Sequence, residues 1–135
     1  MLAFAKEFAR ELTAPSVIEL IGDVGAGKTT FTRGLAEGLG IKEPVTSPSF
    51  TISKRYAFTK NGQPSTLIHY DFYRLPDPGL MSEDLSESLS DPSAITVVEW
   101  ADSVSNLLPS DRITLKIALN DDATRTISRT EEQKQ

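Results

Sequence analysis

The amino-acid sequence predicts an α/β fold in which a mostly parallel central sheet carries antiparallel hairpin additions. A short apolar strand leads into a glycine-rich loop and an amphipathic helix, and a later continuous apolar run is typical of a buried parallel strand. Two further pairs of segments flank turn residues, as in β-hairpins. The chain of 135 residues suits one domain with a single core, which we expect over residues 1–130, followed by a polar disordered tail at 131–135.

The first part of the chain predicts a helix, a strand and a second helix. Pro15 and Ser16 separate the opening helix from an apolar strand at residues 17–21. The second helix starts at Lys28, and Gly40 supplies its stop. Apolar residues form a stripe on the first helix at Leu2, Ala5, Phe8, Ala9 and Leu12, and on the second at Phe31, Leu35, Ala36 and Leu39.

The rest of the chain predicts two hairpins around a buried strand. Alternating residues at 50–58, a turn at Asn61 and Gly62, and a strand at 66–73 predict the first hairpin. A short acidic helix at 81–89, the buried strand at 94–98 and a helical segment at 101–108 follow. Alternation at 113–119, with 124–128 as its partner, predicts a terminal hairpin.

The most specific motif is Gly22-Asp23-Val24-Gly25-Ala26-Gly27-Lys28-Thr29, which spells G-x-x-x-x-G-K-[ST], the phosphate-binding P-loop. Its glycines let backbone N–H groups surround a phosphate, Lys28 reaches the β- and γ-phosphates, and the Thr29 hydroxyl is placed to bind Mg²⁺. The positive end of the following helix also favours an anion. We therefore expect a nucleoside triphosphate on a three-layer fold of the P-loop NTPase type. The nucleotide-binding residues that we predict are Asp23, Val24, Gly25, Ala26, Gly27, Lys28, Thr29 and Thr30.

A P-loop needs a second acid to hold Mg²⁺ or to orient the attacking water, and Glu99 is the candidate. It ends the buried strand at 94–98, and ligands of open α/β sheets bind beyond the carboxyl ends of the strands. Glu99 therefore lies at the same sheet edge as the P-loop if the two strands are parallel neighbours. Trp100, which follows, is either a packing aromatic or a sensor of nucleotide or partner.

Other polar residues suggest chemistry less specifically. Strand alternation puts His69 and Asp71 on one face, and Tyr70 and Phe72 on the other. Asp71 could bind the metal or its water, with His69 orienting it, although a lone histidine is more often structural. In addition, Arg74 could steady phosphate charge, residues 46–50 could form a switch segment, and Arg125 could approach the nucleotide base.

Composition excludes several function classes. Nineteen acidic residues against 14 basic ones give a net charge of −5, which argues against independent nucleic-acid binding, so any nucleic acid is held by another subunit. No apolar run approaches a membrane span, and we expect no signal peptide before the fold. The absence of cysteine excludes disulfides and thiolate metal sites. These features fit a cytoplasmic protein.

Four motifs in order resemble the bacterial TsaE family of ATPases, also called YjeE. They are the P-loop continued through Thr30-Phe31 and Arg33-Gly34-Leu35, the Thr46-Ser47-Pro48-Ser49-Phe50 segment, His69-Tyr70-Asp71-Phe72-Tyr73-Arg74, and Val97-Val98-Glu99-Trp100-Ala101. Val24 and Ser49 stand where the family usually has Leu and Thr.

The resemblance implies an Mg²⁺-dependent ATPase, weak alone, that works with TsaB and TsaD. These partners transfer a threonylcarbamoyl group to the adenosine next to the anticodon of tRNA. It also implies that Lys28 holds phosphate, that Thr29 and Glu99 hold Mg²⁺, and that Asp71 belongs to the active site. Lys28, Glu99 and Asp71 are thus the catalytic candidates.

Two alternatives stay open, a P-loop kinase for a small molecule or nucleotide and a nucleotide-gated binding module that does not require hydrolysis. A regulatory GTPase is disfavoured because the sequence has neither N-K-x-D nor D-x-x-G.

Overall fold

The computed structural model describes residues 2–22, 27–45, 53–72, 80–120 and 125–131. Their secondary structure follows the predicted order of helices and strands. The elements are α1 (Leu2–Glu11), β1 (Ser16–Ile21), α2 (Lys28–Gly38), β2 (Ser53–Lys60), β3 (Gln63–Asp71), α3 (Leu80–Leu89), β4 (Ala94–Glu99), the 3₁₀-helix η1 (Ala101–Leu107), β5 (Ile113–Leu119) and β6 (Arg125–Glu131).

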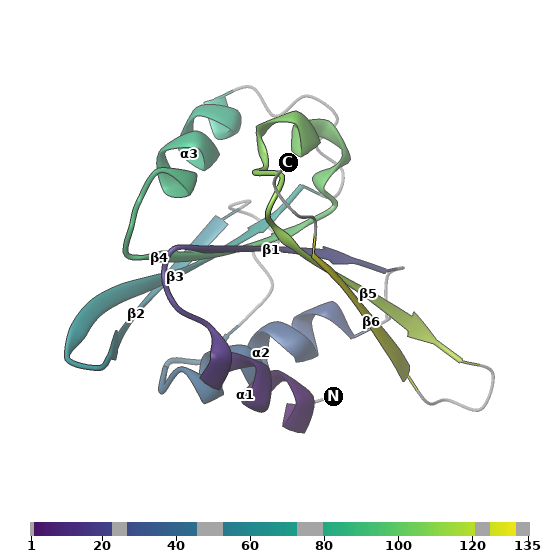
Figure 1. Cartoon of the computed structure of the whole chain (residues 1–135), viewed down its shortest axis with the longest axis horizontal. Helices are drawn as coiled ribbons and strands as arrows, with labels where there is room; N and C mark the ends of the chain where they lie inside the picture. Colours follow the sequence, from purple (N-terminus) through teal and green to yellow (C-terminus); the bar gives the residue numbers. More distant parts are fainter. Residues whose placement is uncertain (1, 23–26, 46–52, 73–79, 121–124, 132–135) are drawn as a thin grey trace.

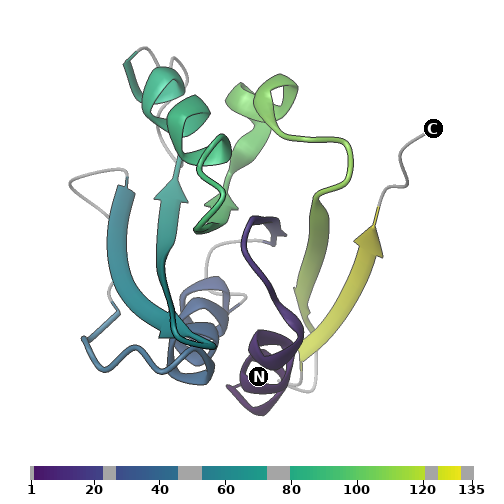
Figure 2. The same cartoon turned by 60° about the vertical axis from the view of Figure 1, so that its left-hand side comes forward.

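The strands form one six-stranded sheet in the order β2-β3-β4-β1-β5-β6. The β3–β4, β4–β1 and β1–β5 pairs are parallel, and the outer pairs β2–β3 and β5–β6 are antiparallel hairpins. Helices α1 and α2 cover one face, and α3 and η1 cover the other (Figure 1). The same three layers appear in the rotated view, with the two hairpins at opposite sides (Figure 2). The predicted α/β fold is confirmed.

The turn between β2 and β3 is shorter than the sequence predicted. Asn61 and Gly62 have φ values of 52° and 78°, the left-handed pair that a two-residue hairpin turn requires. Pairing therefore starts at once, with Lys60 opposite Gln63, so β3 begins three residues before the expected position 66. The predicted helical segment after β4 is a 3₁₀-helix, and β6 extends to Glu131, one residue beyond the expected domain boundary.

The two faces of the sheet bury separate apolar clusters. Phe31 and Leu35 of α2 pack with Leu67 and Val97 on the face that α1 and α2 cover. A second cluster on the opposite face contains Ile68, Tyr70, Phe72, Leu85, Val98 and Val104. All six residues of β4 are buried, as expected for a central parallel strand covered on both faces. None of the helices in the described ranges is long and apolar enough to cross a membrane.

Tyr70 anchors α3 to the sheet. Its side chain is fully buried, and its hydroxyl donates to Oδ2 of Asp84 at 2.6 Å and lies 2.6 Å from Oγ of Ser88. Arg55 of β2 completes the group through Oδ1 of Asp84 at 3.1 Å. Burial, followed by the hydrogen bond to Asp84, raises the pKa of Tyr70 well above its ordinary value of about 10. The hydroxyl is thus a neutral donor under ordinary conditions.

We expect Tyr70→Phe to lower the free energy of unfolding by about 1–3 kcal/mol, because Asp84 and Ser88 lose a buried hydrogen-bond partner. Urea unfolding at neutral pH measures this. Since the native pKa of Tyr70 is raised, the stability that its hydroxyl contributes is present below pH 10 and is lost as the pH rises above it. The difference between wild type and variant should therefore shrink above pH 10.

Tyr56→Phe is the matched control. Tyr56 is also buried, but its hydroxyl has no hydrogen-bond partner among the described residues. Its removal should cost little. An equal loss of stability in the two variants would contradict the anchoring role of Tyr70.

Candidate active site at the carboxyl edge of the sheet

Three central strands bring the predicted site residues to one edge. The strands β1, β4 and β3 are parallel neighbours, and Glu99 at the end of β4 lies opposite Leu20 of β1 and Asp71 of β3. We call this end of the sheet the carboxyl edge. Helix α2 begins at Lys28, seven residues after β1 ends at Ile21, and its first turn lies at this edge (Figure 1). The prediction that Glu99 shares the edge with the P-loop helix is confirmed.

Gly27 sets the start of α2. Its φ and ψ of 110° and 18° are left-handed, a conformation that glycine adopts without steric cost. Its carbonyl accepts the first helical hydrogen bond, from the N–H of Phe31 at 2.8 Å. Thr29 and Thr30 are partly buried in this first turn. Since N–H groups at a helix start have no acceptors within the helix, this turn suits an anion.

Lys28 is buried at the centre of the site, with 6% of its side chain exposed. Its Nζ donates to the carbonyl of Gly22 at 2.7 Å and lies 4.0 Å from Oε1 of Glu99. The same ammonium lies 3.8 Å from the centroid of the Trp100 ring, a cation–π distance. These three contacts compensate the removal of the charge from water.

The two carboxylate oxygens of Glu99 face different partners. Oε2 is hydrogen-bonded to Nε2 of His69, whereas Oε1 is the oxygen nearest Nζ of Lys28. Glu99 is 3% exposed and His69 is fully buried. A buried carboxylate needs such compensation, since an unpaired charge in the interior is costly. Lys28, His69, Glu99 and Trp100 form what we call the Lys28–Glu99 cluster.

Trp100 reaches Lys28 through an unusual backbone. Its φ and ψ of 55° and 52° are left-handed, which costs a residue other than glycine roughly 1–2 kcal/mol. This conformation turns the chain from β4 into η1. Strained residues of this kind gather at functional sites. Of the two interpretations that the sequence left open, the contact with Lys28 favours a role beyond packing.

Asp71 ends β3 beside this cluster. Its neighbour Phe72 donates its N–H to the carbonyl of Glu99 at 3.1 Å, which ties the two strand ends together. Tyr70 and Phe72 stack on the face of α3 with ring centroids 5.8 Å apart, while His69 points to the face of α2. The predicted alternation along this strand is confirmed.

Several predicted site residues lie outside the described ranges. These are Asp23, Val24, Gly25 and Ala26 of the P-loop, the 46–50 segment, and Arg74. Arg125 begins β6 at the carboxyl edge, opposite Leu119, and β5 separates it from β1. The structure therefore places its backbone near this edge.

The described residues contain no group of three His, Cys, Asp or Glu side chains arranged to hold a metal. Proteins usually bind Mg²⁺ through one or two carboxylates together with substrate phosphates and water. Glu99 beside the Thr29 turn fits that pattern. Sequence reasoning missed the partners of Glu99 and Lys28, because strand register and the left-handed turn at Trp100 decide them.

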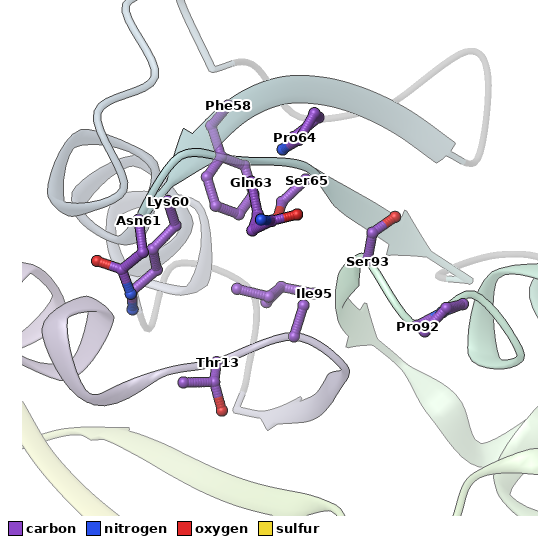
Figure 3. Close-up of a pocket in the computed structure, with 11 residues that line it drawn as sticks. Thr13, Phe58, Lys60, Asn61, Gln63, Pro64, Ser65, Pro92, Ser93 and Ile95 are labelled. Carbon is purple, nitrogen blue, oxygen red and sulfur yellow. The ribbon is translucent and has the colours of Figure 1, made fainter.

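A hollow of about 400 Å³ lies at the opposite edge of the sheet (Figure 3). Its lining includes the start of β3, the turn at Asn61, and Ile95 near the start of β4. Lys60 is the charged residue among the described ones that line it, and its Nζ already donates to carbonyls at the end of α1, including that of Ala9 at 3.2 Å. The residues that the sequence predicts to bind phosphate lie at the carboxyl edge instead.

The layers, the strand order and a helix that starts at a glycine–lysine pair behind a central strand define a three-layer α/β protein of the P-loop NTPase fold. A family model described as threonylcarbamoyl adenosine biosynthesis protein TsaE matches residues 1–127. The chain belongs to the TsaE family.

Relatives and a solved structure agree with this assignment. A tRNA threonylcarbamoyladenosine biosynthesis protein TsaE from Streptomyces coelicolor is 40% identical over 117 residues, which cover 87% of this chain and 78% of the relative. The protein of the same name from Bacillus subtilis is 42% identical over 127 residues, covering 93% and 76%. The crystal structure of Bacillus subtilis YdiB matches with a TM-score of 0.76 and 36% identity, over 98% of this chain and 78% of that one.

The single tryptophan offers a test of the site. A phosphate that draws Nζ of Lys28 from the Trp100 ring should change the fluorescence of Trp100 in a saturable way.

We expect Lys28→Ala to weaken ADP and ATP binding by about 10- to 100-fold, because a charge-assisted contact is lost. Isothermal titration calorimetry measures the nucleotide affinity of the wild type and of Lys28→Ala without relying on the Trp100 fluorescence. Lys42→Ala, an exposed lysine beyond the far end of α2, is the control. Unchanged ATP affinity in Lys28→Ala would contradict the assignment of this segment as a P-loop.

Proposed function

We propose that this protein is an Mg²⁺-dependent ATPase subunit that supports threonylcarbamoyl transfer by TsaB and TsaD to the adenosine next to the anticodon of tRNA. The observation that carries the proposal is the buried pair of Lys28 and Glu99 at the first turn of α2, 4.0 Å apart, in a chain of the TsaE family. The relatives' shared name supplies the pathway, tRNA threonylcarbamoyladenosine biosynthesis.

ATP would bind with its phosphates at the first turn of α2. Support comes from the left-handed Gly27, the N-terminal position of Thr29 and Thr30, and the buried ammonium of Lys28. In this proposal Asp23, Val24, Gly25 and Ala26 complete the phosphate loop, and Arg125 lies toward the base. A phosphate oxygen would replace the carbonyl of Gly22 as the acceptor for Nζ of Lys28.

Thr29 and Glu99 are the proposed Mg²⁺ ligands, and Asp71 is the second carboxylate beside them. When bound, Mg²⁺ would neutralise developing phosphate charge. Lys28 would hold the transferred phosphoryl group in place. Glu99 and Asp71 end adjacent parallel strands, so both carboxylates are supplied by rigid elements at one edge.

Weak activity of the isolated subunit follows from the contacts of Lys28. Its ammonium is held by Gly22, Glu99 and the Trp100 ring, so a phosphate has to compete with these groups. We propose that docking on TsaB and TsaD favours the arrangement in which Lys28 contacts phosphate. The net charge of −5 supports an arrangement in which TsaB and TsaD, and not this protein, hold the tRNA. We place the protein in the cytoplasm.

The first test is phosphate release from Mg-ATP by the purified chain, alone and with its cognate TsaB and TsaD. We expect slow release alone and faster release with both partners, because docking would free Lys28 for phosphate. Adding either partner separately is the control. Absence of any stimulation by the pair would contradict the proposed place in the modification machine.

Glu99→Ala separates hydrolysis from nucleotide-gated docking. We expect the variant to form the complex with ATP, since Lys28 remains, while phosphate release falls by about 10²-fold or more and multiple turnover of tRNA modification is lost. Glu19→Ala is the matched control, because Glu19 is also buried but pairs with Arg112 at 2.9 Å, away from the site. Full modification by Glu99→Ala would instead indicate a binding module in which hydrolysis is dispensable. Formation of a phosphorylated small molecule would indicate a kinase.

A further inference from the structure

His69 is buried in the middle of the sheet and can shift little. It lies on β3, opposite Lys54 of β2 and Val97 of β4, so strands pair with its backbone on both sides. Its side chain is fully buried. From the position opposite Val97, its imidazole extends to the carboxylate of Glu99, two residues further along β4. The imidazole is therefore a group of defined position beside that carboxylate.

The two ring nitrogens of His69 have different surroundings. Nε2 contacts Oε2 of Glu99, whereas Nδ1 is buried without a hydrogen-bond partner among the described residues. A carboxylate only accepts, so Nε2 carries the hydrogen that is donated to it. A hydrogen on Nδ1 would bury an unpaired donor, which is costly. We assign the neutral tautomer with hydrogen on Nε2.

This hydrogen bond decides which oxygen of Glu99 faces the nucleotide. With Oε2 held by His69, Oε1 is the oxygen on the side of Lys28. Lys28 alone would not fix that orientation, since its ammonium is a point charge on a flexible stem. Partners behind a metal-binding carboxylate orient it, and their loss commonly costs 10–100-fold in metal affinity or activity, as a rough guide.

We propose that His69 is a positioning residue, which holds Glu99 so that Oε1 is presented to the Mg²⁺-nucleotide. This inference rests on the proposed function of the site. It assigns His69 no direct contact with nucleotide and no transfer of a proton. Its effect is to reduce the number of carboxylate orientations that metal binding has to restrict.

A matched pair of variants tests the proposal. The amide nitrogen of Gln is the same number of bonds from Cα as Nε2 of histidine, whereas that of Asn corresponds to Nδ1. His69→Gln therefore keeps a donor near Glu99, and His69→Asn removes it. We measure ADP affinity by calorimetry with Mg²⁺ and with EDTA. We expect the gain in affinity from Mg²⁺ to fall about tenfold in His69→Asn and to stay within about threefold of wild type in His69→Gln. Affinity in EDTA should be unchanged in both.

A double-mutant cycle separates positioning from general damage. If His69 acts through Glu99, His69→Asn should cause no further loss of the Mg²⁺ effect in a Glu99→Gln background. Additive losses would overturn the proposal, as would a normal Mg²⁺ effect in His69→Asn. A wild-type protein that binds no Mg²⁺-nucleotide would overturn the proposed function itself, so the two failures are distinguishable.

A spectroscopic measurement on the untagged chain does not depend on whether the His69 variants fold. Because His69 is the only histidine, its two ring ¹⁵N signals need no assignment among residues. We expect hydrogen on Nε2 and none on Nδ1, and a shift of the Nε2 signal in Glu99→Gln. Hydrogen on Nδ1, or ring signals that are unaffected by Glu99→Gln, would overturn the proposal.

Discussion

The burial of a lysine ammonium at the N-terminal end of a helix is the constraint on which the site depends. The positive end of α2 repels a cation, and the interior offers no water to hydrate one. Lys28 tolerates this position because the carbonyl of Gly22, the carboxylate of Glu99 and the Trp100 ring surround its Nζ. A polyanion suits the same place better than any of these groups, which gives the proposed nucleotide a physical reason to bind there.

The sheet delivers these compensating groups because its central strands are parallel and aligned. Glu99 lies opposite Leu20 on one side and Asp71 on the other, so both acids reach the edge where α2 begins. Side chains along β3 then point alternately to the two faces of the sheet. His69 supports Glu99 on the side of α2, whereas Tyr70 holds α3 on the opposite side through Asp84. One strand thus carries both the site and the anchor of a helical layer.

Much of this fold could be predicted because its signals are local. The Asn61-Gly62 turn, the alternation around Tyr70 and the apolar run of β4 each depend on neighbouring residues. The 3₁₀ form of η1 and the early start of β3 were missed. Both depend on details of turn geometry, for which residue pattern is a weak guide.

The sequence alone determined the phosphate-binding motif, the order of the elements and which residues of an alternating strand share a face, because glycine conformations and side-chain periods are properties of short segments. Only the tertiary structure decided that β4 lies between β1 and β3, that Glu99 meets His69, and that Trp100 covers Lys28. These contacts join residues far apart in the chain. Strand register and core packing set them, and no local pattern specifies which strands become neighbours when they are not joined by a hairpin turn.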